Sequence, residues 1–318
     1  MTEFDTVAVL VLAYNRVDVL QKTLDAICRE VPNKIYVSID GPDRTKPNDP
    51  TKVKSVNDFL QSYPFPCNFE IMAGETNGGV FDGVLQGIDW FFTQESMGVI
   101  LEDDVSIAEG SLGLAFQLLK EYEGNDTVGS ISLFNPVPGR HLTQPDDSFR
   151  FSTLPSSQYW ATWENRWDAS HHFRTLTPKN RAQLIESLEQ IPDVRFRQYW
   201  EQSLEVQIDR PTSWEDLWIF THWLKRWSAV YTNSNYSTHL GFNSDATNSW
   251  DKPSWYPEKT ESWTGEVRKP ESLAIDYKAD KWYFNQRFGL STWKRVKRFI
   301  WLRAPKLRHT YLRLRGLR

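Results

Sequence analysis

The sequence predicts an α/β fold with a mainly parallel central sheet. Two observations support this class. In the first third of the chain, short apolar runs alternate with stretches that carry apolar residues at helical spacing, and turn residues separate them. The apolar runs are continuous, as in strands that are buried on both faces of a sheet. Such alternation requires right-handed crossovers between parallel strands, with ligand-binding groups beyond the strands' carboxyl ends.

The expected elements can be placed in order. Continuous apolar runs predict strands at residues 7–13, 34–39, 68–72 and 98–105. A helix is expected before Pro32, because Leu20, Leu24, Ile27 and Val31 recur at helical spacing. Further helices are expected at 53–60 and 80–92.

The strand at 98–105 delivers three consecutive carboxylates, Glu102, Asp103 and Asp104, to its end. Adjacent acids repel one another, so a positive partner is expected, and a divalent cation bound through carboxylate oxygen is the simplest one. Mg²⁺ or Mn²⁺ fits best, because both keep open positions for substrate phosphates. An alternative is that the acids only precede a helix, since Ser106 and Glu109 match a capping box. That box leaves the three acids unexplained.

Other polar groups are expected at the same edge of the sheet, where they would suit a nucleotide and its diphosphate. These are Ala13, Tyr14, Asn15 and Arg16 after the first strand, Asp40 after the second, and Gly79 before the helix at 80–92. The sequence has no Gly-x-Gly-x-x-Gly or Walker-type loop, which argues against a dinucleotide enzyme or a P-loop kinase. The metal would hold the diphosphate instead.

Composition narrows the class of protein. The 318 residues are 40% apolar and 25% charged, which is ordinary for a globular protein. The apolar run at 7–13 is too short for a secretion signal or a membrane span, so we expect a cytoplasmic protein. Cys28 and Cys67 lack metal-binding spacing, and we expect both to be small buried residues without a disulfide.

The second half is rich in tryptophan, with fourteen of the fifteen from Trp160 onward. Most should lie in the core. Flat aromatic faces also suit the C–H faces of sugars, and an indole N–H can bond a hydroxyl. Trp160, Trp163 and Trp214 are therefore candidates for contact with a sugar acceptor.

A second acidic site is predicted at the start of a helix. Thr212 and Glu215 match a capping box, so Glu215 has a structural explanation and Asp216 does not. Asp216 is the preferred candidate for a catalytic base, with Glu215 as the second choice. His239, in a polar segment, is a candidate metal ligand with Asp104.

Charge is divided unevenly along the chain. Residues 281–318 hold twelve Lys and Arg and no acid, which leaves 25 basic against 41 acidic residues before them, so the tail carries +12 and the body −16. Trp293, Val296, Phe299 and Ile300 share one helical face among cations, a pattern typical of a helix that lies on an anionic membrane. A solvated tail, or one that docks on the acidic body, is the alternative; nucleic acid is not expected, because no reading motif accompanies the charge.

The order of these motifs resembles GT-A glycosyltransferases of the N-acetylglucosaminyltransferase I family, and more closely the bacterial haemolysin-like (HlpA-like) nucleotide-diphospho-sugar transferases. The matching segments, all within about residues 5–250, are 100–104, 160–163, 213–214, Gly241 and 245–247. The sequence departs from the family at Gln158-Tyr159, at Glu215, where the family has Asp, and at Asn248, where it has His.

The resemblance implies a GT-A (Rossmann-like) fold and an inverting, metal-dependent transferase, with UDP favoured as the nucleotide. It implies that Arg16 and Asp40 contact the nucleotide base, Asp103 the ribose and Asp104 the metal, with Glu102 supporting that site. We expect a nucleotide-sugar-binding half at 1–135, an acceptor-binding and catalytic half at 136–280, and a basic tail at 281–318 that holds the enzyme on the inner face of the membrane.

The predicted function is sugar transfer from a nucleotide-diphosphate sugar to a glycan or lipid-linked acceptor, in cell-surface polysaccharide synthesis. Two other classes remain open. A non-catalytic sugar-binding protein derived from such an enzyme would keep the tryptophans but could lose the acids. A metal-dependent phosphohydrolase would explain the acids but not the tryptophans, and it usually needs a second metal site with His ligands.

Overall fold

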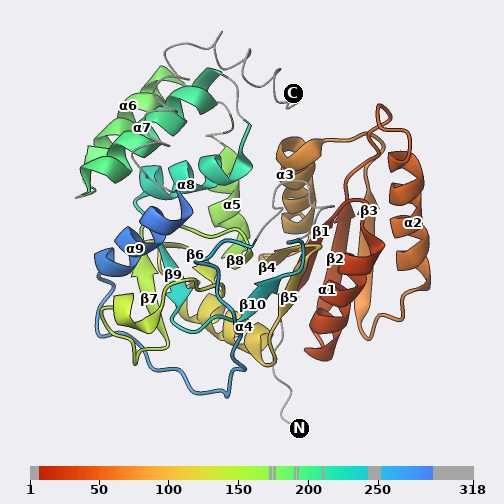
Figure 1. Cartoon of the computed structure of the whole chain (residues 1–318), viewed down its shortest axis with the longest axis horizontal. Helices are drawn as coiled ribbons and strands as arrows, with labels where there is room; N and C mark the ends of the chain where they lie inside the picture. Colours follow the sequence, from red (N-terminus) through yellow and green to blue (C-terminus); the bar gives the residue numbers. More distant parts are fainter. Residues whose placement is uncertain are drawn as a thin grey trace.

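A computed structural model describes residues 7–171, 174, 177–189, 191, 193–209, 212–242 and 252–288. Within these residues an eight-stranded sheet runs through the whole molecule (Figure 1). Its strands, in spatial order, are β3 (Asn68–Ala73), β2 (Lys34–Ile39), β1 (Val9–Ala13), β4 (Met97–Glu102), β8 (Tyr159–Trp163), β6 (Val128–Ser132), β9 (Ser228–Thr232) and β7 (Phe149–Ser152).

All strands of this sheet except β8 and β7 run in one direction, because β8 pairs antiparallel with both of its neighbours and β7 pairs antiparallel with β9. The mixed α/β class and the mainly parallel, Rossmann-like sheet are therefore confirmed. Strands from before and after residue 135, the predicted boundary between the two halves, belong to this one sheet. A separate two-stranded ribbon pairs β5 (Val105–Ile107) with β10 (Ser237–His239).

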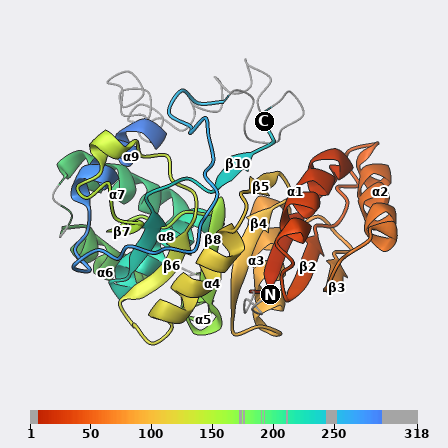
Figure 2. The same ribbon diagram turned by 90° about the horizontal axis from the view of Figure 1, so that it is seen from below.

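Helices cover both faces of the sheet. One face packs against α1 (Val17–Arg29), α2 (Asp49–Ser62) and α4 (Ser111–Tyr122). The other packs against α3 (Gly79–Phe92), α5 (Glu164–His171) and α8 (Trp214–Lys225). A third apolar cluster lies among α6 (Pro178–Glu189), α7 (Val194–Asp209) and α9 (Tyr277–Arg287), near the short turn η1 (Gly139–His141). Figures 1 and 2 show α6 and α7 at the opposite end of the molecule from α2.

The local predictions differ from the structure in three places. α1 ends at Arg29, and Val31 lies beyond it with a φ of 48° and 56% of its surface exposed. The fourth predicted strand stops at Glu102, so the next two acids lie in a turn. The capping box at Ser106 is wrong, because Ser106 belongs to β5 and pairs with β10, while α4 starts only after Gly110.

Two further expectations concern cysteine and the tail. Cys28 and Cys67 are free thiols, as expected, but both are only partly buried. The predicted tail starts inside α9, where Tyr283 and Phe284 are 4% and 1% exposed. Residues 289–318, which carry the predicted membrane-binding face, lie outside the described residues. Among the helices that are described, none is long and apolar enough to cross a bilayer.

Candidate functional site

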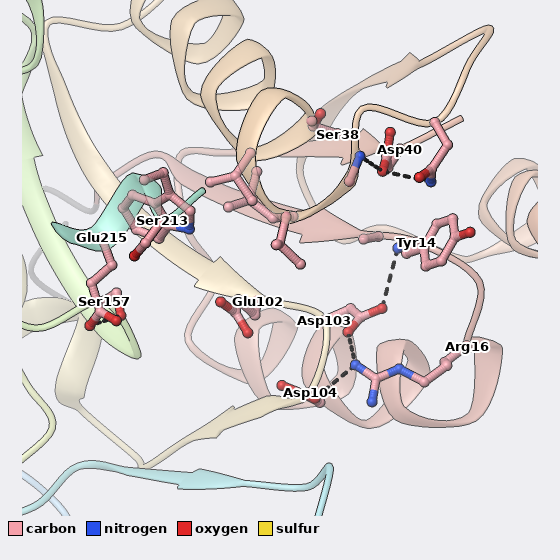
Figure 3. A pocket seen from close by; sticks show the side chains of 18 of the residues that line it. Tyr14, Arg16, Ser38, Asp40, Glu102, Asp103, Asp104, Ser157, Ser213 and Glu215 are labelled. Atoms are coloured by element: carbon pink, nitrogen blue, oxygen red, sulfur yellow. Dashed lines mark hydrogen bonds and ion pairs between the residues drawn. The ribbon is translucent and has the colours of Figure 1, made fainter. Parts of the chain in front are cut away.

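A cleft of about 520 Å³ opens at the carboxyl ends of β1, β2 and β4, facing the start of α8 (Figure 3). Most residues that the sequence singles out come together here. They are Ala13, Tyr14, Arg16, Asp40, Gly79, Glu102, Asp103, Asp104, Trp214, Glu215 and His239. The residues after β1, β2 and β4 converge because parallel strands end at one edge of a sheet. α8 and β10 add Trp214, Glu215 and His239 from the second half of the chain.

The carboxylates at the end of β4 meet a guanidinium. Arg16 Nη2 donates to Asp103 Oδ1 at 2.6 Å and to Asp104 Oδ2 at 2.7 Å. Asp103 also accepts from the backbone N–H of Tyr14 at 3.3 Å. Arg16 is thus the positive partner that the adjacent acids require. One guanidinium offsets only one of the three carboxylates.

The remaining negative charge suits a divalent cation. Potential ligand atoms of Glu102, Asp104 and His239 all lie within 4.8 Å of one another. Asp104 Oδ1 is buried and accepts no hydrogen bond from the described residues, which is costly unless another partner takes its lone pairs. Carboxylate and imidazole groups of this kind match Mn²⁺, and two carboxylates alone match Mg²⁺. The residues present therefore fit a bound cation.

His239 needs one rearrangement before it can join such a site. Its Nδ1 accepts from the backbone N–H of Gly241 at 2.9 Å, and its Nε2 lies 3.5 Å from Asp104 Oδ1. Burial lowers the pKa of His239, so the ring is neutral at pH 7 and carries its proton on Nε2. In this arrangement Nε2 carries the proton beside Asp104 without a hydrogen bond to it, and His239 could ligate a metal only after releasing the contact with Gly241.

Burial dominates the acid–base behaviour of the cluster. Burial, together with the charges of Asp104 and Asp103, raises the pKa of Glu102 to about 8. Burial also raises the pKa of Asp103 to about 6, although Arg16 opposes this shift. Without a metal, Glu102 therefore holds a proton at pH 7, which relieves the repulsion among the acids.

Asp40 has a structural task at the edge of the cleft. Its carboxylate accepts from the backbone N–H groups of Gly78 at 2.7 Å and Gly79 at 2.9 Å, and from Asn77 Nδ2 at 2.9 Å. The start of α3 is thereby tied to the end of β2, with Gly79 at a φ of 66° that favours glycine. Contact of Asp40 with a nucleotide base stays a prediction, and its oxygens are already engaged.

Tyr14 and Asn15 share a buried acid beside the cleft. Tyr14 Oη donates to Asp49 Oδ2 at 2.6 Å, and Asn15 Nδ2 donates to Asp49 Oδ1. Asp49 is 4% exposed. Asn15 does not line the cleft and instead fixes the loop after β1, which orients Tyr14 and Arg16.

At the start of α8 the two candidate bases lie in different surroundings. The cap is Ser213, not Thr212, since Ser213 Oγ accepts from the backbone N–H of Asp216 at 3.1 Å. Asp216 Oδ2 accepts from Ser203 Oγ at 2.6 Å and Gln207 Nε2 at 3.1 Å, so its carboxylate faces α7, outside the cleft. Glu215 lines the cleft, and which of the two acids is the base stays a prediction.

The predicted acceptor contacts of Trp160 and Trp163 are not supported. They are 1% and 2% exposed and belong to the core on opposite faces of β8, as their spacing along a strand requires. Trp214 lines the cleft and stacks on Trp160, with ring centroids 5.9 Å apart. Trp214 alone of the three can meet an acceptor.

Some residues of the site carry no sequence signal. Lys46 lines the cleft from the loop after β2, and Ser157 lines it just before β8. Arg287 reaches Glu215 from α9, 72 positions away. No local motif marks them, because each is placed by long-range packing.

Comparisons with known proteins add little. No protein-family model matches the chain, and no curated protein does. HddC from Yersinia pseudotuberculosis is 8% identical over 50% of this chain and 77% of its own, with a TM-score of 0.28. A UDP-glucose pyrophosphorylase complexed with UDP-glucose is 7% identical over 53% of this chain and 81% of its own, with a TM-score of 0.30. UTP-bound UGPase from Acinetobacter baumannii is 10% identical over 74% of this chain and 88% of its own, with a TM-score of 0.33. Likeness at these TM-scores carries no argument, so the function is argued from the cleft.

Proposed function

We propose that this chain is a metal-dependent glycosyltransferase that uses a nucleotide-diphosphate sugar, with UDP favoured by the resemblance described above. The observation that carries the proposal is the convergence of two acidic sites on one cleft. Glu102 and Asp104, with His239 nearby, lie at the end of β4, and Glu215 lies across from them (Figure 3). A transferase needs both, one for the leaving diphosphate and one for the incoming hydroxyl.

The donor would lie along the strand ends. Its diphosphate would sit over Glu102 and Asp104, where bound Mn²⁺ or Mg²⁺ offsets the negative charge that grows on the leaving group. Tyr14 and Arg16 line the same edge of the cleft and would hold the nucleoside. Lys46 also lines the cleft, where its ammonium group forms an ion pair with Asp43 at 3.1 Å and its side chain is 66% exposed.

Glu215 would serve as the general base. It would take the proton of the acceptor hydroxyl as the oxygen attacks the anomeric carbon from the face opposite the diphosphate, which inverts the configuration. General bases contribute about 10²–10⁴-fold to turnover. Trp214 is adjacent and would pack against the acceptor sugar. A glycan or lipid-linked acceptor and attachment to the inner face of the membrane through residues 289–318 belong to this proposal.

The two other classes are less well supported. A phosphohydrolase with two metals needs a second group of ligands, and among the described residues the group of Glu102, Asp104 and His239 stands alone. A protein that only binds sugars does not need a carboxylate opposite the metal site.

The test is a screen of UDP-, GDP- and dTDP-sugars with and without Mn²⁺, followed by identification of the products. Metal-dependent release of the nucleoside diphosphate supports the proposal. Release of inorganic phosphate would indicate a phosphohydrolase. Binding of a sugar without any release would indicate the non-catalytic class.

A further inference from the structure

The best-defined feature outside the acid cluster is the contact between α9 and the candidate base. Glu215 Oε1 accepts from Arg287 Nη2 at 2.5 Å and from Ser157 Oγ at 2.7 Å. Both contacts fall on the same carboxylate oxygen. Within the described part of the chain no donor contacts Oε2, so that oxygen is the one free to accept a proton.

Arg287 is itself held in place. Its Nη1 donates to Tyr283 Oη at 3.0 Å, and its guanidinium lies 5.3 Å from the ring centroid of Phe288. The side chain is 24% exposed, against 23% for Glu215. Burial works against the charge of Arg287, but Glu215 and Tyr283 more than offset it and hold the pKa well above its usual value. The guanidinium is therefore a fixed cation.

The helix that carries Arg287 is docked firmly on the sheet. Asp280 accepts from Ser152 Oγ at 2.6 Å and from Thr153 Oγ1 at 2.7 Å, at the end of β7. Asp276 caps α9 and also accepts from Thr143 Oγ1 at 2.7 Å. Such buried side-chain bonds fix the position of the helix along the sheet. The position of Arg287 relative to the cleft is thus set by the fold.

We propose that Arg287 is a positioning residue for Glu215: it fixes Oε1 and so presents Oε2 to the acceptor. This inference rests on the proposed function. Arg287 does not line the cleft, so it acts through Glu215 rather than on the substrate. A carboxylate with both oxygens free would rotate about its last torsion and spend less time in the reactive orientation. The working enzyme therefore extends into the segment that the sequence assigns to a membrane tail.

The test compares Arg287→Ala with Lys281→Ala, which removes an exposed cation from the same helix. Turnover is measured as Mn²⁺-dependent release of nucleoside diphosphate with water as the acceptor, using the fastest of UDP-glucose, GDP-mannose and dTDP-glucose. We expect Arg287→Ala to lower turnover at saturating donor about tenfold or more, with the donor KM little changed, because the loss lies in positioning. Added methylguanidinium should restore part of the turnover. Lys281→Ala should behave as wild type.

Glu215→Gln separates this inference from the function that it rests on. If Glu215→Gln is inactive and Arg287→Ala keeps wild-type turnover, Glu215 is the base and needs no positioning by Arg287, which overturns the inference alone. If Glu215→Gln keeps full turnover, both the base and its positioning are refuted. In the double variant, Arg287→Ala should add almost no loss to that of Glu215→Gln, since both act through one group.

Should Arg287→Ala fail to fold, Arg287→Lys decides. The lysine ammonium group lacks the two separate NH₂ groups with which Arg287 donates to Tyr283 and Glu215 at the same time. A partial loss of turnover is therefore expected in a folded protein. Unchanged turnover in folded Arg287→Lys would overturn the role of the guanidinium.

Discussion

Metal binding at the acid cluster should displace a proton from Glu102. A carboxylate must be deprotonated to bind a metal, and burial with the neighbouring Asp104 and Asp103 raises the pKa of Glu102 to about 8. Roughly nine-tenths of the metal-free protein is then protonated at this residue at pH 7. Raising the pH removes the competing proton, so the apparent affinity for Mn²⁺ should increase about tenfold per pH unit below 8 and level off above it.

Isothermal titration with MnCl₂ tests this directly. At about pH 7, titrations in buffers of different ionisation enthalpy should show about one proton released per ion bound. Glu102→Gln should bind Mn²⁺ more weakly and lose most of the pH dependence. Glu109→Gln is the control, because Glu109 is an exposed acid outside the lining of the cleft. A dissociation constant that stays the same from about pH 6 to pH 8 would refute the reasoning.

Three other predictions follow from the same geometry. Folding raises the pKa of Glu102 from 4.5 to about 8, so the metal-free protein should lose stability as the pH rises between these two values. In EDTA, Glu102→Gln should therefore raise Tm near pH 8 but not near pH 4. Asp104→Ala should abolish Mn²⁺-dependent release of nucleoside diphosphate while circular dichroism stays native; activity in EDTA would contradict the metal role. Glu215→Gln should lower turnover about 10²–10⁴-fold at unchanged donor affinity. Asp216→Asn should instead mainly lower the free energy of unfolding, by about 1–3 kcal/mol. Loss of turnover in Asp216→Asn but not in Glu215→Gln would make Asp216 the base.

Truncation separates the proposed membrane tail from the enzyme. A protein that ends at residue 288 should lose binding to anionic liposomes and keep the release of nucleoside diphosphate with water as acceptor, as measured by flotation and by turnover. Ending at residue 280 should instead destabilise the fold by several kcal/mol, because it removes Tyr283 and Phe284 from the core. Equal liposome binding by the 288-residue and full-length proteins would rule out the membrane anchor.

The sequence correctly predicts which residues meet at the strand ends of the cleft, for a physical reason. Strands buried on both faces are marked by continuous apolar runs, and parallel strands end at one edge, so the residues after each run must converge. Arg16, Asp104 and Glu102 are found in this way. Tryptophan gives no such guide: whether Trp160 lies in the core or the cleft depends on which elements cover β8, and α5 and α8 cover it.

The choice between Glu215 and Asp216 depends on where one helix begins. Thr212 and Ser213 can both cap a helix, and the sequence alone does not choose between them. Moving the cap by one residue turns every side chain by about 100° around the axis. With Ser213 as the cap, Glu215 faces the cleft and Asp216 faces α7. One residue of helix register thus decides which acid can do chemistry.

Charge balance links the metal-free and metal-bound states of the acid cluster at the end of β4. Three adjacent acids require positive charge, and Arg16 supplies it to Asp103 and Asp104. Among the described residues Glu102 forms no ion pair of its own, and burial raises its pKa to about 8, so that it holds a proton at pH 7. A divalent cation would replace that proton and also satisfy the open oxygen of Asp104. In the metal-free cluster, Glu102 therefore holds a proton in a place where a metal can bind, which is why metal binding and pH must be coupled here.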